Sequence, residues 1–115
     1  MSKNAFICLD PFHFWRVGHS PELLKTADPR LFPYTQIDDG VDTEGPPPRG
    51  RCEIGTGNVP LAEILAALPA DLPLSIEWGR PRDSNYTAAE WAAIALQATR
   101  RALSKEHQPD AAQLH

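Results

Sequence analysis

The sequence predicts an α/β protein built on parallel strands. Three short segments, residues 5–9, 31–39 and 72–79, have strand-like composition and end in turn-forming or charged residues. Each is followed by a segment with helix-starting residues or an apolar stripe at helical spacing. Because successive strand–helix units place their strands in parallel, with right-handed crossovers, this order favours an α/β sheet over an antiparallel one.

The first unit begins with the apolar run at residues 5–9, AFICL. Asp10 and Pro11 follow as a turn, and His13 then stands between two phenylalanines, a setting that suits a pocket better than a solvated loop. Residues 20–22, Ser-Pro-Glu, supply an N-cap, a first-turn proline and an acidic first turn for a short helix. A strand is therefore expected to end in polar and aromatic side chains before its helix begins.

The second unit is expected to have its strand at residues 31–39 and a polar, Pro- and Gly-rich loop at residues 40–57. A helix over residues 60–70 follows. Its aliphatic side chains recur at i, i+3, i+4 and i+7, which places them on one face. They are Leu61, Ile64, Leu65 and Leu68.

The third unit has its strand at residues 72–79 and a long helix after a capping box, Thr87-x-x-Glu90. The expected domain, residues 1–104, ends with this helix, and the polar tail at residues 105–115 is expected to be disordered. The apolar stripe of the helix consists of Trp91, Ile94, Ala95 and Ala98.

Composition excludes several classes of function. The formal net charge of −4 argues against a nucleic-acid binder, which normally carries a basic face. No segment approaches the ~20 apolar residues of a membrane helix, and the first apolar run is too short for a signal peptide. Two cysteines, Cys8 and Cys52, have neither the number nor the spacing of a disulfide framework or a zinc site. We therefore expect a cytoplasmic protein in which Cys8 is a small core residue.

Polar side chains at the strand ends distinguish between an open doubly wound sheet and a (β/α)8 barrel. Asp10, the pair Gln36 and Asp38, and Glu77 all lie at or near the carboxyl end of a predicted strand. A barrel builds its site from its strand ends all round, whereas an open sheet binds ligands mainly where the strand order reverses. The pattern favours the barrel, and because a whole barrel takes about 250 residues, we expect a part of one.

Four motifs resemble those of the sugar phosphate isomerase/epimerase family of xylose-isomerase-like TIM barrels. Each motif is weak alone, but their order and spacing along three strand–helix units make the combination specific. The resemblance covers residues 5–103 and implies the last three βα units of the barrel, its C-terminal portion. The motifs are LDPFH with Asp10 and His13, YTQIDD with Gln36 and Asp38, RCEIGTGNVPL with Arg51, Gly55 and Gly57, and SIEWGRP with Glu77.

The resemblance implies a role for each strand-end residue. Asp10, Gln36 and Glu77 match residues that hold one divalent metal ion, together with a glutamate from an earlier strand that has no counterpart in this sequence. Gln36 stands where the family more commonly has histidine. His13 and Arg51 match residues that contact the oxygens of the substrate, a sugar or sugar phosphate. Glu77 also matches one of two glutamates that share the acid–base work.

These residue types suit the movement of a proton on a carbon next to a carbonyl. That step needs a base near neutrality and a positive group that holds the enediolate oxygen, and a carboxylate beside a divalent ion provides both. Oxygen-rich ligands favour manganese or magnesium over zinc. The sequence therefore predicts a metal-dependent isomerase or epimerase that is incomplete as an isolated chain.

Two alternatives accompany this prediction. A non-catalytic remnant or accessory subunit would keep the packing of the barrel without turnover. Under either reading the exposed strand edges of a shortened barrel predict a homo-oligomer or a partner chain that completes the barrel. The apurinic-endonuclease relatives of the family use a histidine-rich cluster of several zinc ions, and the small number of histidines argues against that function. They are His13, His19, His107 and His115.

Overall fold

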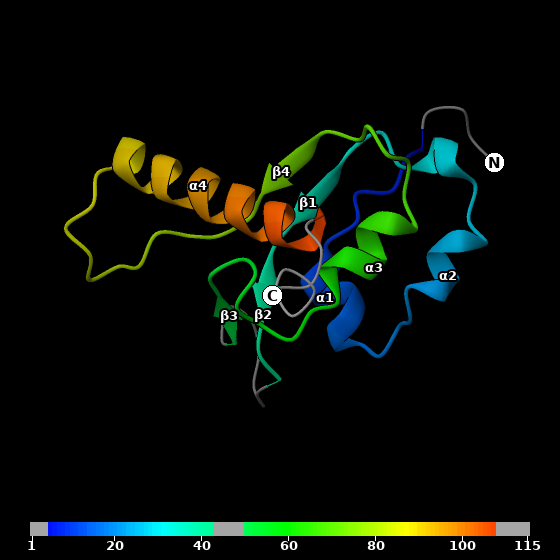
Figure 1. The fold of residues 1–115 in the computed structure, drawn as a ribbon, viewed down its shortest axis with the longest axis horizontal. Helices are drawn as coiled ribbons and strands as arrows, with labels where there is room; N and C mark the ends of the chain where they lie inside the picture. Colours follow the sequence, from blue (N-terminus) through cyan, green and yellow to red (C-terminus); the bar gives the residue numbers. More distant parts are fainter. Residues whose placement is uncertain (1–4, 43–49, 108–115) are drawn as a thin grey trace, which may run out of the picture.

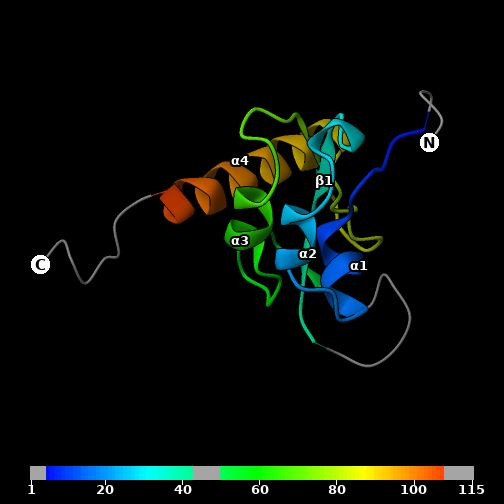
Figure 2. The same cartoon turned by 90° about the vertical axis from the view of Figure 1, so that its right-hand side faces the viewer.

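Four helices and two small two-stranded sheets make up the described part of the computed structural model, which covers residues 5–42 and 50–107 (Figure 1). Figure 1 and Figure 2 both place α3 between α2 and α4. In chain order the elements are α1 (Pro11–Arg16), α2 (Glu22–Lys25), the 3-10 turn η1 (Pro29–Leu31), β1 (Thr35–Ile37), β2 (Asp39–Gly40), β3 (Arg51–Cys52), α3 (Leu61–Ala66), β4 (Leu74–Ile76) and α4 (Ala88–His107). None of the helices in the described segments is long and apolar enough to cross a membrane.

Three segments from three successive units run parallel, as predicted. β1 pairs with β4 in parallel, with Gln36 opposite Ser75. On the other edge of β1, Leu9 forms a parallel bridge with Thr35, and its carbonyl accepts the N–H of Gln36 at 2.9 Å. This α/β arrangement with parallel neighbours is the one expected for part of a barrel.

The two faces of the parallel sheet differ in burial. Thr35 and Ile37 of β1 are fully buried, and Ile37 belongs to one apolar cluster with residues of α3 and α4. Gln36, which points the opposite way in an alternating strand, is half-buried, and its neighbour Ser75 is exposed. Tyr34 is 40% exposed. The helices therefore cover one face, and the face that carries Gln36 and Ser75 is open.

The first predicted strand, residues 5–9, is less regular and less buried than expected. Only Leu9 takes part in a bridge, and it is also the only buried residue of the five. Phe6 is 61% exposed, and Cys8 is exposed, so the prediction that Cys8 is a core residue is wrong. Within the described residues this segment has a neighbour strand on one side only, which leaves its apolar side chains without cover.

A short helix, α1, occupies the position where a turn was predicted. Asp10 is its N-cap, because the Asp10 carboxylate accepts the N–H of His13 at 3.1 Å, and Pro11 takes the first helical position. The Asp-Pro junction therefore starts a helix directly after the strand. Phe12 on this helix is buried at 1% exposure.

The later elements follow the prediction, with shorter strands and a shorter α3 but a longer α4. The capping box is confirmed: the N–H of Thr87 donates to Glu90 at 2.9 Å, and the N–H of Glu90 donates to the Thr87 hydroxyl at 3.1 Å. The helix continues to His107, so residues 105–107 are helical, and residues 108–115 of the predicted tail lie outside the described part of the chain. The predicted strand at residues 31–39 is divided between η1, β1 and the start of β2.

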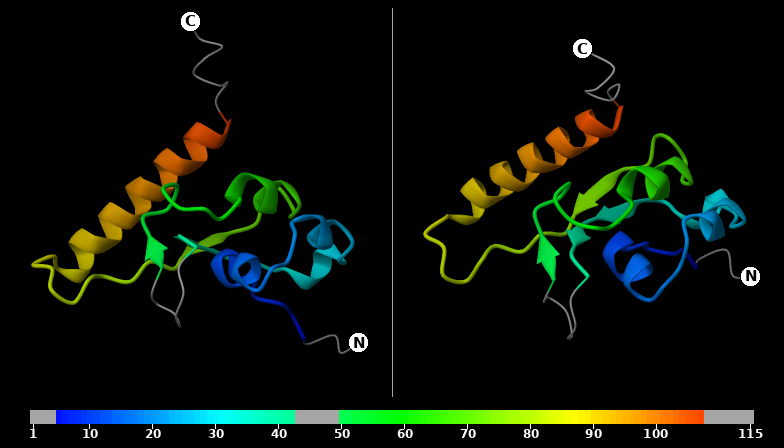
Figure 3. Two further views of the ribbon diagram at one scale, coloured as in Figure 1. Left: turned by 90° about the horizontal axis from the view of Figure 1, so that it is seen from below. Right: turned by 60° about the horizontal axis from the view of Figure 1, so that its bottom comes forward.

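An antiparallel pair that the sequence did not predict brings residues 51 and 52 back to the end of the parallel sheet. β2 pairs with β3, with Gly40 opposite Arg51. The pair lies beyond the carboxyl ends of β1 and β4 (Figure 1 and Figure 3). Gly40 suits this position because a Cβ atom there would overlap the ring of Phe12. The consequence is that Arg51 is carried to the strand ends.

Candidate functional site

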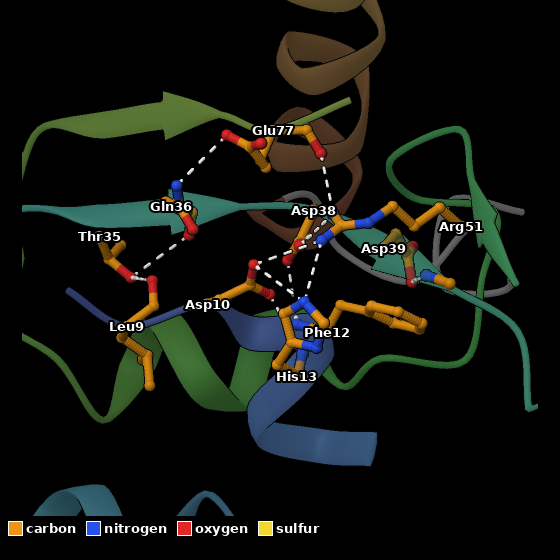
Figure 4. A network of polar contacts seen from close by, with 11 residues as sticks. Leu9, Asp10, Phe12, His13, Thr35, Gln36, Asp38, Asp39, Arg51 and Glu77 are labelled. Atoms are coloured by element: carbon orange, nitrogen blue, oxygen red, sulfur yellow. Dashed lines mark hydrogen bonds and ion pairs between the residues drawn. The ribbon is translucent and has the colours of Figure 1, made fainter. Parts of the chain in front are cut away.

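The polar residues predicted from the strand ends come together at one edge of the parallel sheet (Figure 4). Asp10 follows the bridge residue Leu9 directly, and Gln36 lies within β1. Glu77 follows β4, and its N–H donates to the Ile37 carbonyl at 2.9 Å, which extends the parallel pairing by one residue. The Gln36 amide donates to the Glu77 carboxylate at 3.2 Å. Neighbouring parallel strands thus bring their terminal side chains to one place.

Arg51 contacts residues from all three units. Its Nη1 donates to the Asp38 carboxylate at 2.5 Å and to the backbone carbonyl of Glu77 at 3.2 Å. Its Nη2 donates to the Asp10 carboxylate at 3.5 Å and lies 3.2 Å from Nε2 of His13. The side chain is only 17% exposed. The guanidinium therefore provides the positive charge at the centre of the site.

Asp38 is the most deeply buried acid of the site, at 1% exposure. One carboxylate oxygen accepts the N–H of Phe12 at 2.9 Å, and the other accepts from Arg51. Burial, followed by a hydrogen bond with Asp10 and the charge of that residue, raises the pKa of Asp38 to about 7, although the Phe12 N–H and Arg51 oppose this rise.

The pKa of Asp10 is shifted in the opposite direction. Burial alone would raise its pKa, but the hydrogen bond with Asp38, the N–H of His13 and the charges of His13 and Arg51 outweigh burial, so the pKa of Asp10 is lowered. The contact between the two carboxyl groups thus moves their pKa values in opposite directions, up for the more buried Asp38 and down for Asp10.

Asp39 is buried next to this pair and holds the loop that follows Arg51. Its carboxylate accepts four backbone N–H groups, from Gly40 at 2.8 Å, Gly55 at 2.9 Å, Gly57 at 3.0 Å and Val59 at 3.2 Å. Gly55 has φ of +95°, and a Cβ atom on Gly57 would overlap the Asp39 carboxylate. The glycines of the R-x-x-x-G-x-G motif thus allow the loop to close around Asp39.

Comparisons with known proteins place this fold. Neither a family model nor a curated protein matches the sequence. Among solved structures, the IolI protein, whose crystal structure at 1.8 Å holds a zinc atom, matches with a TM-score of 0.78 and 29% identity over 94% of this chain. A xylose isomerase-like TIM barrel/4-hydroxyphenylpyruvate dioxygenase fusion protein matches over 90% of this chain (TM-score 0.68, 23% identity). So does a xylose isomerase domain protein from Alicyclobacillus acidocaldarius over 91% (TM-score 0.65, 21% identity).

The chain is part of a xylose-isomerase-like TIM barrel. It spans 41% of the IolI chain, 19% of the fusion protein and 38% of the Alicyclobacillus protein. The partial length agrees with the open face of the parallel sheet, since a closed barrel of this kind would cover that face with further strands. The expected architecture, a partial (β/α) barrel with parallel strands, is confirmed.

The three predicted metal ligands of this partial barrel differ in their surroundings. Gln36 and Glu77 contact each other, and Glu77 is exposed on the open face, whereas Asp10 is engaged with Arg51. Within residues 5–42 and 50–107, no three His, Cys, Asp or Glu side chains form a group that could hold a metal ion. Two carboxylates and one amide oxygen are ligands that suit a hard divalent ion, but they fill only about half of its six positions. The donor chemistry of the three residues therefore suits a hard divalent ion, and a site built on them would need further ligands.

Sequence reasoning gave no separate role to Asp38 and none to Asp39. Both follow Gln36 in the motif QIDD. The available signal was two consecutive acids directly after a predicted strand, and the structure shows that both are buried. What the sequence did not reveal was the partner of each acid. Arg51 and the loop glycines lie more than ten residues away along the chain, and only the pairing of β2 with β3 brings them back.

Proposed function

We propose that this chain supplies part of the active site of a metal-dependent sugar or sugar phosphate isomerase or epimerase, corresponding to the last three strand–helix units of the barrel. The observation that carries the proposal is the convergence of Asp10, Gln36, Glu77 and Arg51 at the strand ends, which is where barrel enzymes build their sites. The fold match to xylose-isomerase-like barrels supports the reaction class as an analogy.

The reaction in this proposal transfers a proton at a carbon next to a carbonyl. Glu77 is the catalytic residue of this chain: its carboxylate is exposed on the open face, where it can reach a substrate carbon and accept a proton. His13 and Arg51 bind substrate oxygens. The Asp10 and Asp38 pair holds Arg51 in place and keeps its charge near the oxygen that becomes negative as the proton leaves.

Asp10, Gln36 and Glu77 are the residues that would hold the metal ion in this proposal. When bound, a divalent ion supplies positive charge that stabilises an enediolate oxygen. We propose manganese or magnesium because all three donors are oxygen atoms. Zinc is the competing candidate, since the related IolI protein binds a zinc atom.

Completion of the barrel is the second part of the proposal. The open face exposes Phe6, Tyr34 and Glu77, and the edge formed by residues 5–9 has a strand neighbour on one side only among the described residues. Such surfaces favour pairing with further strands. We propose that the remaining strand–helix units, in a partner chain, cover this face and supply the second acid–base group. A second copy of this chain could cover the same face in a homo-oligomer but would bring no second acid–base group. The free thiols of Cys8 and Cys52 suit a reducing cytoplasm.

A non-catalytic remnant or accessory subunit is the alternative function. The ion pairs of Arg51 favour it, because a guanidinium that is already paired with Asp10 and Asp38 stabilises the strand ends whether or not a substrate binds. Under this alternative the motif residues contribute to packing and to ion pairs, without turnover.

Solvent-proton exchange into a sugar distinguishes the two functions. The chain is assayed alone, and also fused to the first five units of a homologous xylose-isomerase-like barrel, in heavy water with a ketose or ketose phosphate. Deuterium at the carbon next to the carbonyl is followed by NMR, with and without manganese. We expect little exchange from the isolated chain, because it carries one acid–base group, and metal-dependent exchange from the fusion.

Two variants make the assay specific. Glu77→Gln should reduce exchange by the fusion about 10²- to 10⁴-fold, the usual effect of removing an acid–base group. Glu63→Gln, an exposed change on α3, is the matched control and should leave exchange unchanged. Robust exchange by the isolated chain would contradict the incomplete site, and a fusion without exchange would favour the non-catalytic alternative.

A further inference from the structure

Arg51 reaches the site from a short strand after a loop, and two neighbouring acids restrain it. The Asp38 carboxylate pairs with the guanidinium, while Asp39 binds the backbone of the loop that begins after Arg51. Side chains on consecutive residues of an extended chain point in opposite directions. Asp38 can therefore hold the Arg51 side chain on one side of the strand, while Asp39 holds the loop that follows Arg51 on the other side.

We propose that Asp38 is a positioning residue that fixes the direction of the Arg51 guanidinium. This inference deepens the proposed function, in which Arg51 contacts substrate oxygens. Asp38 is suited to the task because it does not itself reach solvent, at 1% exposure, and because the N–H of Phe12 holds its other oxygen at 2.9 Å. Because a backbone N–H fixes one oxygen of the buried carboxylate, the guanidinium can approach only the other oxygen, and from one direction.

The remaining contacts of Arg51 are longer and come from different elements. The Asp10 carboxylate lies 3.5 Å away, and the Glu77 carbonyl and Nε2 of His13 lie 3.2 Å away, against 2.5 Å for Asp38. The guanidinium also lies over the Phe12 ring, 5.2 Å from its centre. Phe12 thus supports both members of the pair, with its N–H on Asp38 and its ring under Arg51. Loss of the Asp38 charge should leave the arginine mobile while the helix that carries Phe12 stays in place.

Asp38→Asn tests this separation of roles. The asparagine oxygen still accepts the Phe12 N–H, but the amide group cannot pair with a guanidinium as a carboxylate does. The measurement is made above pH 7, where the Asp38 carboxyl is ionised. Exchange of the Arg51 guanidinium hydrogens with water, followed by NMR on nitrogen-15-labelled chain, should become faster by on the order of tenfold or more. Exchange of the Phe12 N–H should remain as slow as in the wild type, which a loss of fold would not allow.

An exposed arginine–aspartate ion pair provides the matched control. Arg30 pairs with Asp28 at 2.8 Å, but its side chain is 89% exposed. Asp28→Asn should change the Arg30 signals and leave those of Arg51 unaltered. In the wild type itself, the Arg51 guanidinium should exchange at least about tenfold more slowly than that of Arg30, and this comparison holds even if Asp38→Asn fails to fold.

Turnover adds a functional readout. In the completed barrel, Asp38→Asn should raise KM more than it lowers kcat if Arg51 binds the substrate in the ground state. The NMR comparison needs no turnover, so failure of the proposed activity would not hide failure of the positioning role. The inference is overturned if Arg51 exchanges as fast as Arg30 in the wild type, or if Asp38→Asn leaves Arg51 exchange unchanged.

Discussion

Removal of the Asp39 carboxylate should destabilise the protein strongly. In Asp39→Ala, the four backbone N–H groups that now donate to this carboxylate at 2.8 to 3.2 Å lose their acceptor. Asp39 is 2% exposed, and Gly40 and Val59 are buried beside it, so water cannot reach their N–H groups unless the loop opens. Gly55 is exposed, so its N–H can regain water more easily. Opening of the loop would also release the segment that carries Arg51.

The magnitude follows from the number and the kind of these hydrogen bonds. A hydrogen bond to a charged group contributes about 1.5 to 3 kcal/mol, but groups that regain water when the loop opens recover part of this. We expect Asp39→Ala to lower the free energy of unfolding by about 3 to 5 kcal/mol. That is a large fraction of the ~5 to 15 kcal/mol of a typical domain. Asp39→Asn keeps one acceptor oxygen and should cost less.

Urea denaturation followed by tryptophan fluorescence measures this loss. The matched control is Asp83→Ala, a change of an exposed acid, which should alter the free energy of unfolding by no more than about 0.5 kcal/mol. If Asp39→Ala unfolds at the same urea concentration as the control, the carboxylate does not hold the loop, and the account of the glycine motif is wrong.

Two further predictions concern pH and association. Because the folded chain keeps a proton on Asp38 up to about pH 7, whereas an unfolded aspartate loses it near pH 3.8, the free energy of unfolding should fall between these values as pH rises, by at most about 1.4 kcal/mol per pH unit. Urea denaturation across this range should show the slope in the wild type and not in Asp38→Asn. The open face with exposed Phe6 and Tyr34 predicts that the isolated chain self-associates or folds only marginally. Sedimentation that shows a compact, cooperatively melting monomer would count against an incomplete barrel.

Much of the fold was predictable because it depends on local signals. The capping box at Thr87 and the apolar faces of the last two helices depend on residues within a few positions of each other. The contact between Gln36 and Glu77 was predictable for a different reason: parallel neighbouring strands end at a common edge, so side chains at their ends can meet whatever the length of the crossovers.

The errors concern helix caps and contacts between distant parts of the chain. Asp10 and Pro11 carry the N-cap and first-position signals of a helix, but the same dipeptide is also a common turn, and the turn was chosen. The apolar residues 5–9 indicated burial, yet composition does not reveal whether a neighbour covers them. The pairing of Arg51 with Asp38 depends on strand pairing across a Pro-rich loop, which no local pattern specifies.

Manganese binding shows whether the strand ends form a metal-dependent sugar site. Titration of the chain with Mn²⁺, with the free ion measured by electron paramagnetic resonance, should show one saturable site. Glu77→Gln should weaken binding at least about tenfold, since it removes one of two charged ligands, while the control Glu63→Gln binds as the wild type does. Equal affinity of the wild type and Glu77→Gln, or no saturable binding by either, would contradict the assigned site.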